Sequence, residues 1–415
     1  MLPTIAGWTR ILALGAGISA LALCQIPPSE PLPPAEVKPF QDEIRRIEGL
    51  LETAGDKSTV LYALARTWAA GGQYQEAMRV LEKVAALKVG LDPSNDDIFA
   101  KLRASSEFER LLRQIRDDTP PVAHGRVAFT VDESDLFPEG IAWDSRSRRF
   151  LLGSTFKHKI VACTSAGACQ DFVKEGQDGL GEVLGLKANP RDGTVWAASN
   201  GEQESRLFHF DGAGRLVRKY TISQKPDPHL FNDLVVDSSG NVFVTDTRAA
   251  TVYWVSHPTD RLEILNPALD VQAANGIAIS EQGGERLYVA GFPDGITVVD
   301  VASRSFRALP HPADLCLGTI DGLYYFDGSL FAIQNSIMVH RAVRYRLTHD
   351  LDAIDGFEIL ERRNPLFDGG PTTAAIADGA LYFMANNQLD DVADGKIKAG
   401  SRLNPIKVLR VDLGR

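Results

Sequence analysis

From residue 125 onward, one pattern recurs six times and limits the possible fold more than any other feature of the sequence. Each copy has an apolar strand, a tight turn and a second apolar strand. The residues that open the six copies are Glu139, Leu184, Asn232, Asn275, Asp321 and Thr372, at spacings of 45, 48, 43, 46 and 51 residues. A period in the mid-forties with paired strands and Gly-rich turns is typical of β-propellers. The sequence therefore predicts a mainly β protein, with a six-bladed β-propeller over 125–415 that follows a small α-helical module.

The turns and the ends of the β region support this interpretation. Dipeptides typical of hairpin turns fall at the same phase in four copies: Asp192-Gly193, Ser239-Gly240, Asp327-Gly328 and Asp378-Gly379. The sixth copy lacks one strand, whereas an extra strand at 126–131 precedes the first copy. We expect 126–131 to pair with 407–413 in the sixth blade, because this pairing closes the ring without an open edge.

The opening residues also suggest a metal site, because the inner strands of a propeller all begin at the same face, around the axis. Two carboxylates and two carboxamides meet there: Glu139, Asp321, Asn232 and Asn275. Each of them alone would be interpreted as a turn or loop residue. Together they are hard oxygen donors whose two negative charges match one divalent cation, which favours Ca²⁺ or another oxygen-bound divalent cation. No His or Cys opens a copy, which argues against zinc.

Motifs at four of these positions carry a specific resemblance. They are Pro138-Glu139-Gly140-Ile-Ala-Trp143, Asn232-Asp233 with Asp237-Ser-Ser-Gly240-Asn-Val-Phe-Val-Thr245-Asp246, Asn275-Gly276-Ile-Ala, and Asp321-Gly322. Roughly residues 125–415 resemble the senescence marker protein, gluconolactonase and luciferin-regenerating-enzyme family, whose propeller is shared with paraoxonases and diisopropylfluorophosphatase-like hydrolases. The resemblance implies an axial calcium site and a calcium-dependent hydrolase of lactones or related esters. Two features depart from it: Leu184 stands where paraoxonases carry a histidine, and the helical module lies outside the family's core pattern.

In the reaction that the resemblance implies, the cation polarises a substrate carbonyl oxygen and a base activates water, or a side chain attacks directly. Asp321 is the first candidate for base or nucleophile, because the family is thought to use the corresponding aspartate. His229, on the loop before Asn232, is the second candidate, and its alternative is an ordinary solvent-exposed histidine. Asp233, which follows Asn232, is expected to orient that ligand, and Asp246 is expected either to orient Asn232 or to begin a turn. Residues that follow second strands are expected at the rim of a substrate pocket: Phe156, Phe292, Asn335 and Asn387.

Residues 40–118 have apolar residues at helical spacing, with helices expected at 41–51, 59–70, 74–87, 96–104 and 107–116. The second and third of these resemble one tetratricopeptide repeat, with Gly71-Gly72 between them. One such repeat cannot build a long binding groove, because repeat arrays need several neighbours. The module is therefore either a docking element for a protein partner or a helical cap on the propeller.

The first 39 residues have the features of an export signal and a linker. Residues 11–23 are a short apolar run after Arg10, which predicts a signal peptide at 1–23. Cleavage after Ala22 competes with a lipobox that would lipidate Cys24. Residues 24–39 are rich in Pro and are expected to form an extended linker. The chain is therefore expected in the periplasm of a bacterium or as a membrane-anchored lipoprotein, with lipidation as its sole contact with a membrane.

The remaining cysteines and the net charge add further limits. Cys163 and Cys169 flank a predicted hairpin tip and are expected either to form a disulfide in an oxidising compartment or to remain free, whereas Cys316 is expected to be buried. The net charge of −10 argues against nucleic acid as a partner. Two classes of function remain: a hydrolase of a small-molecule lactone, ester or phosphotriester, and a non-catalytic, calcium-stabilised propeller that binds a ligand or protein. A lyase or synthase that resembles strictosidine synthase is a distant third.

Overall fold

The computed structural model describes residues 25–280 and 285–414 of the chain. These residues form two compact units, one mainly helical (up to residue 53 and 60–118) and one mainly β (54–59 and 119 onward). Residues 1–23, where the signal peptide is predicted, and Cys24 lie outside the described residues.

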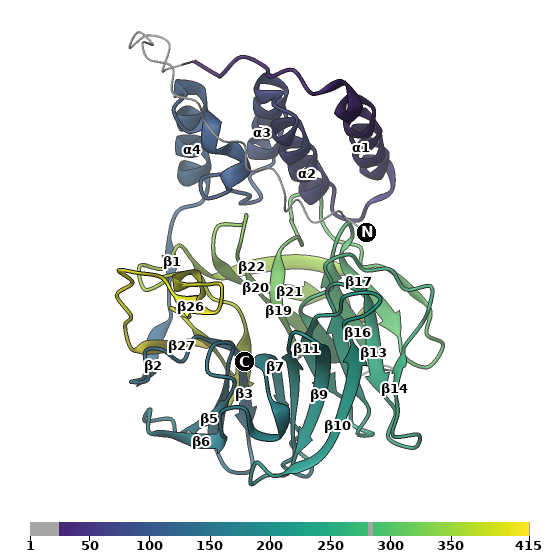
Figure 1. Cartoon of the computed structure of the whole chain (residues 1–415), viewed down its shortest axis with the longest axis vertical. Helices are drawn as coiled ribbons and strands as arrows, with labels where there is room; N and C mark the ends of the chain where they lie inside the picture. Colours follow the sequence, from purple (N-terminus) through teal and green to yellow (C-terminus); the bar gives the residue numbers. More distant parts are fainter. Residues whose placement is uncertain (1–24, 281–284, 415) are drawn as a thin grey trace. The chain divides into compact units, whose positions relative to one another are not determined.

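The helical unit has the elements α1 (Pro34–Thr53), α2 (Lys57–Ala70), α3 (Tyr74–Ala86), the 3₁₀ helix η2 (Asp97–Leu102) and α4 (Ser106–Asp118) (Figure 1). The expected helices are thereby confirmed, and their likeness to a tetratricopeptide repeat stays a prediction. The expectation of an extended linker as far as residue 39 is wrong, because α1 begins at Pro34 and contains Pro39. Pro34 stands at the first position of α1, where its missing N–H has no helical acceptor, so a Pro-rich run can also begin a helix.

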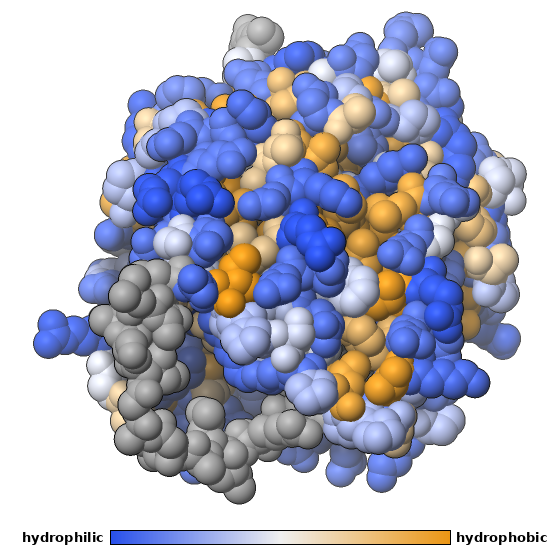
Figure 2. Space-filling model, turned by 90° about the horizontal axis from the view of Figure 1, so that it is seen from above, coloured by the Kyte–Doolittle hydropathy of each residue, from blue (hydrophilic) through white to orange (hydrophobic). Residues whose placement is uncertain are grey.

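The surface seen from above mixes hydrophilic side chains with smaller apolar areas (Figure 2). No helix among the described residues is both long enough and apolar enough to span a membrane.

The propeller consists of six antiparallel sheets, and each of the first three blades is built from four consecutive strands (Figure 1). Blade 1 is β3 (Pro138–Asp144), β4 (Arg149–Ser154), β5 (Ile160–Cys163) and β6 (Cys169–Val173). Blade 2 is β7 (Glu182–Ala188), β8 (Val195–Asn200), β9 (Glu204–Phe210) and β10 (Leu216–Ser223), after the 3₁₀ turn η3 (Gln177–Gly179). Blade 3 is β11 (Phe231–Val236), β12 (Val242–Asp246), β13 (Thr251–Val255) and β14 (Leu262–Ile264). Strand β12 is buried along its whole length, because each sheet packs between two others.

Blades 4 to 6 complete the ring. Blade 4 is β15 (Ile277–Ser280), β16 (Arg286–Gly291), β17 (Gly295–Asp300) and β18 (Phe306–Ala308). Blade 5 is β19 (Ile320–Phe326), β20 (Ser329–Gln334), β21 (Arg341–Leu347) and β22 (Ile354–Arg362), with β1 (Val122–Ala123) added at its outer edge. Blade 6 is β23 (Ala374–Ala377), β24 (Ala380–Met384), β27 (Ile406–Asp412) and β2 (Arg126–Val131), and a loop within it carries the turn η4 (Leu389–Asp391) and the small hairpin β25 (Val392–Ala393) and β26 (Lys396–Ile397). The predicted closure is confirmed, because β2 pairs with β27 from Val131 opposite Ile406 to Arg126 opposite Arg410.

The first strands of the six blades contact one another in a closed ring in the order β3, β7, β11, β15, β19 and β23. Glycine after the opening residue permits this close approach. A Cβ atom on Gly140 would lie 2.2 Å from the carbonyl oxygen of Leu184, and one on Gly185 would lie 2.4 Å from that of Asn232. These glycines therefore belong to strands that touch their neighbours rather than to the turns that the dipeptides suggest in isolation.

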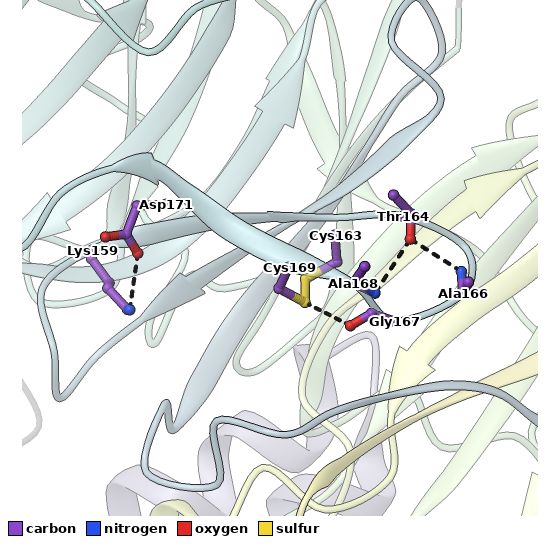
Figure 3. The surroundings of a disulfide bond; sticks show 8 residues. All are labelled: Lys159, Cys163, Thr164, Ala166, Gly167, Ala168, Cys169 and Asp171. Carbon is purple, nitrogen blue, oxygen red and sulfur yellow. Dashed lines mark hydrogen bonds and ion pairs between the residues drawn. A yellow bond between two sulfur atoms is a disulfide. The ribbon is translucent and has the colours of Figure 1, made fainter.

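A disulfide joins Cys163 and Cys169, the last residue of β5 and the first residue of β6 (Figure 3). The two residues lie directly opposite each other in the hairpin, with their Cα atoms 4.0 Å apart. The alternative of two free thiols is therefore wrong for this structure. Cys316 is free and fully buried, as expected.

Candidate metal centre

The structure gathers the four predicted ligands at one end of the ring of first strands. Glu139, Asn232 and Asp321 are the second residues of β3, β11 and β19, and Asn275 lies two residues before β15. In these three strands the pairing with the second strand shifts register beside the ligand, as between Pro138 and Gly140. Such a bulge turns the local side chain away from the regular ladder of the sheet.

The two amides are held so that their nitrogen atoms are already bonded. Asn275 donates from Nδ2 to Oδ1 of Asp321 at 2.9 Å, and Asn232 donates from Nδ2 to Oγ1 of Thr247 at 3.0 Å. Thr247 in turn donates to the carbonyl oxygen of Ala274 at 2.6 Å. Each amide therefore keeps its Oδ1 atom for another partner, which is the orientation that a metal ligand requires.

Two oxygen atoms at this site are buried and have no hydrogen-bond partner among the described residues: Oε2 of Glu139 and Oδ1 of Asn275. Glu139 is only 6% exposed. Buried polar atoms in native proteins are nearly always bonded, so an orphaned pair of acceptors beside a carboxylate needs an explanation. A bound cation would supply one, because both atoms are hard oxygen ligands of the kind that calcium uses.

The electrostatics of the site also favour a positively charged ligand. Burial raises the pKa of Glu139 well above its usual value, and the carboxylates of Asp321 and Asp233 raise it further. Burial likewise raises the pKa of Asp321 to about 6, although hydrogen bonds from Asn335 and Asn275 oppose this shift. Three carboxyl groups thus repel one another in a buried place, and a divalent cation would relieve that repulsion.

His229 and Asp246, which the sequence suggests separately, form a pair in the structure. Nδ1 of His229 lies 2.6 Å from Oδ2 of Asp246, and the side chains are 12% and 0% exposed. Asp246 also accepts hydrogen bonds from the backbone N–H groups of Leu230, Arg248 and Ala249 at 3.0, 3.2 and 3.0 Å. With Nδ1–H donated to this carboxylate, the imidazole has Nε2 available as a proton acceptor. The interpretation of His229 as an ordinary exposed histidine is therefore wrong.

The four expected rim residues have different environments. Asn335 lies next to the ligands, because its Nδ2 donates to Oδ2 of Asp321 at 2.6 Å and to the carbonyl oxygen of Pro371 at 3.0 Å. Phe156 is half-buried against Phe137, with ring centroids 5.2 Å apart, and Phe292 is also half-buried. Asn387 is fully buried. A role for these residues in a substrate pocket stays a prediction.

Several contributors to the site are not suggested by the pattern of opening residues. Thr247 orients Asn232 from the loop after β12, and Asn335 restrains Asp321 from the end of β20. Both Thr247 and Asn335 are uncharged. The described part of the chain contains no group of three or more His, Cys, Asp or Glu placed to hold a metal. The candidate site is therefore mixed, with amides completing a pair of carboxylates.

No family model matches the chain, and no curated protein matches its sequence. Among solved structures, the allergen Mala s 1 of Malassezia sympodialis is similar with a TM-score of 0.52 at 16% identity, covering 68% of this chain and 96% of that one. A gluconolactonase from Xanthomonas campestris gives 0.47 at 15% identity, covering 70% and 97%. A luciferin-regenerating enzyme gives 0.46 at 16% identity, covering 71% and 95%. The likeness to Mala s 1 concerns the fold alone and agrees with the six-bladed propeller that the sheets of the structure form.

Proposed function

We propose that this chain is a calcium-dependent hydrolase of lactones or related esters. The observation that carries the proposal is the pair of buried, unbonded oxygen atoms, Oε2 of Glu139 and Oδ1 of Asn275, beside Asp321. Glu139, Asn232, Asn275 and Asp321 would hold the ion. Bound there, calcium would act as a Lewis acid that takes up negative charge on a substrate carbonyl oxygen.

The chain's own groups provide the remaining chemistry. Asn275 and Asn335 each donate to one oxygen of Asp321, which favours its ionised form as a ligand. With both oxygens already engaged, Asp321 is a weaker candidate for the proton acceptor than the sequence suggests. We infer that His229 is the base, because Asp246 holds its ring and would stabilise the imidazolium formed when Nε2 takes a proton from water.

We also infer that the protein is exported from a bacterial cell. The Cys163–Cys169 disulfide supports this inference, because such bonds persist in oxidising compartments and are rare in the cytosol. The predicted signal peptide is consistent with the same location. We also propose, from the sequence alone, that Cys24 is lipidated and that the helical unit binds a protein partner.

The experiment is hydrolysis of a panel of lactones and aryl esters by the full chain, with calcium and with a chelator. Calcium-dependent turnover supports the hydrolase. Binding of calcium without turnover on any substrate would instead favour the ligand-binding propeller, the second class of function that the sequence leaves open.

Three variants then assign the base. His229→Ala should lower kcat by about 10²-fold or more while calcium binding is retained, because general-base contributions have that size. His257→Ala is the matched control, since His257 is an exposed residue of the same blade. Asp321→Asn should weaken calcium binding, and excess calcium should restore part of its rate. If excess calcium fails to rescue Asp321→Asn while His229→Ala stays active, the base or nucleophile is Asp321.

A further inference from the structure

Three consecutive residues at the end of β12 contact both the candidate base and the candidate metal centre. They are Thr245 and Asp246, which end the strand and are fully buried, and Thr247, which follows it. Alternate residues of an extended chain point to the same face, so the two threonines share one face and Asp246 has the other. Asp246 holds His229 there. The middle residue therefore serves the candidate base, and its two neighbours serve the metal centre.

The hydroxyl of Thr247 determines which atom of the Asn232 amide faces it. A hydroxyl group has one proton, and Thr247 donates it to the carbonyl oxygen of Ala274 at 2.6 Å, a group that can only accept. Oγ1 of Thr247 is therefore left as an acceptor for Asn232, which donates from Nδ2 at 3.0 Å. The opposite atom of the amide, Oδ1, is thereby left for the cation. A carbonyl group just before blade 4 thus sets the orientation of a ligand in blade 3.

Thr245 makes the corresponding connection one residue further along each of the two segments. Its Oγ1 accepts from the backbone N–H of Asp233 at 3.1 Å and donates to the carbonyl oxygen of Asn275 at 2.8 Å. The carbonyl oxygen of Asp233, at 3.2 Å, is a second and longer acceptor for the same proton. Two threonine hydroxyls therefore bridge the same two chain segments, each of which carries one candidate ligand.

The bulge in β11 gives a physical reason for these side-chain bonds. The register of β11 against β12 shifts between Phe231 and Leu234, so that two residues of β11 stand against one residue of β12. The two are Asn232 and Asp233, and the one is Thr245. A bulge interrupts the regular ladder of backbone hydrogen bonds, and the threonine hydroxyls supply bonds in its place.

We propose that Thr245 and Thr247 are positioning residues that hold Asn232 and Asn275 as a pair and fix the amide orientation of the first. The half of the metal centre that comes from blades 3 and 4 is then assembled before calcium binds, so the ion does not have to order it. This inference rests on the calcium site of the proposed function and extends it to the residues on which the affinity of that site depends.

The experiment measures the Ca²⁺ dissociation constant of the full chain by calorimetry, and the melting temperature of each variant in chelator. Thr247→Val keeps the shape of the side chain but removes the acceptor for Asn232, so the dissociation constant should rise by about ten- to hundredfold. Thr247→Ser keeps the hydroxyl and should bind calcium nearly as tightly as wild type. Thr251→Val is the matched control, because Thr251 is a buried threonine opposite Asp246 whose hydroxyl has no hydrogen-bond partner among the described residues.

A carboxylate at position 232 separates the orientation of the amide from general damage. Asn232→Asp has two equivalent oxygens and no N–H group, so no amide has to be oriented. Thr247→Val should therefore weaken calcium binding in the chain with Asn232 and leave it nearly unchanged in the chain with Asn232→Asp. If the loss is the same in both, Thr247 only holds two segments together, and its role in orienting Asn232 is refuted.

Thr245→Val tests the second bridge and keeps the experiment decisive if Thr247→Val does not fold. It leaves the buried N–H of Asp233 without its acceptor and releases the carbonyl group of Asn275, so the Ca²⁺ dissociation constant should rise, whereas Thr245→Ser should bind like wild type. If wild type binds calcium and neither valine variant binds it more weakly than Thr251→Val does, the role of the two threonines is refuted while the calcium site stands. If wild type does not bind calcium, the proposed metal centre itself is refuted, and this inference with it.

Discussion

Asp56 provides a sharp test of how the segment 54–59 is attached to the propeller. The residue is 1% exposed and precedes α2, and its Oδ1 accepts from the backbone N–H groups of Ser58 and Thr59 at 3.0 and 3.2 Å, as an N-cap does. Its Oδ2 accepts from the hydroxyl of Thr59 and from the backbone N–H of Leu317, both at 2.8 Å. One buried carboxylate thus caps a helix and bonds to a loop that lies 261 residues later in the chain.

The cost of Asp56→Ala can be estimated from these bonds. Loss of an N-cap costs about 0.5–2 kcal/mol, and leaving the N–H of Leu317 buried without a partner costs about 1–3 kcal/mol. The free energy of unfolding should therefore fall by about 1.5–5 kcal/mol. Asp56→Asn retains one acceptor oxygen and should lose about half as much, because the amide nitrogen cannot accept from the second set of donors.

Urea unfolding followed by circular dichroism measures this loss. Asp211→Ala is the matched control, because Asp211 also accepts from two backbone N–H groups, those of Ala213 and Arg215, but in an exposed turn between β9 and β10. It should cost less than about 1 kcal/mol. If Asp56→Ala is no more destabilised than Asp211→Ala, the buried bonds contribute little and this reasoning is refuted.

Three further predictions concern the metal centre and the closure of the ring. Calcium at one hundred times its dissociation constant should stabilise the protein by about 2.7 kcal/mol. Glu139→Gln should need more calcium for the same increase in melting temperature. A melting temperature that responds neither to calcium nor to chelator would contradict the site. In chelator, the folded-state pKa of about 6 for Asp321 exceeds the unfolded value, so this group's contribution to stability should fall as the pH rises from about 4 to 6. The gain in melting temperature from calcium should accordingly be larger at pH 7 than at pH 5, and an equal gain at both would refute the assignment. Deletion of residues 407–415 removes most of β27, which pairs with both β2 and β24, and should abolish the cooperative thermal transition of the propeller; a transition like that of wild type would show that the closure is dispensable.

The propeller and its ring of polar residues are predictable from sequence because both depend only on the position of each residue within the repeat. Six strand pairs at a regular period leave few other folds, and residues at the same phase of a closed repeat must lie near one axis. The closure could also be predicted, because the sixth copy lacks one strand and 126–131 is an extra strand that can take its place. The meeting of the candidate ligands Glu139 and Asp321 near the axis follows from the same reasoning.

What holds those ligands in place could not be predicted in the same way. Thr247 and Asn335 lie after second strands, where loops vary in length, so their phase does not specify their partners. Nζ of Lys187 in β7 lies 5.2 Å from the ring centroid of Tyr324 in β19. This contact depends on two blades being opposite each other, which is a property of the closed ring and not of either strand. The bond from Asp56 to Leu317 could not be predicted either, because the two residues lie 261 positions apart in the sequence.

The ring also explains why calcium binding by itself does not separate an enzyme from a binding propeller. Four blades supply the donors, whereas blade 2 offers Leu184 and blade 6 offers Thr372, whose hydroxyl is used to bond the carbonyl oxygen of Glu139 at 3.1 Å. Calcium takes six to eight oxygen ligands, so about two to four positions would remain for water and for the oxygens of a ligand. A lactone that is hydrolysed and a ligand that is bound without reaction could use those open positions equally well. The difference must come from a group that moves a proton, and His229, oriented by Asp246, is such a group. Loss of turnover with intact calcium binding in His229→Ala is therefore the result that distinguishes the two classes of function.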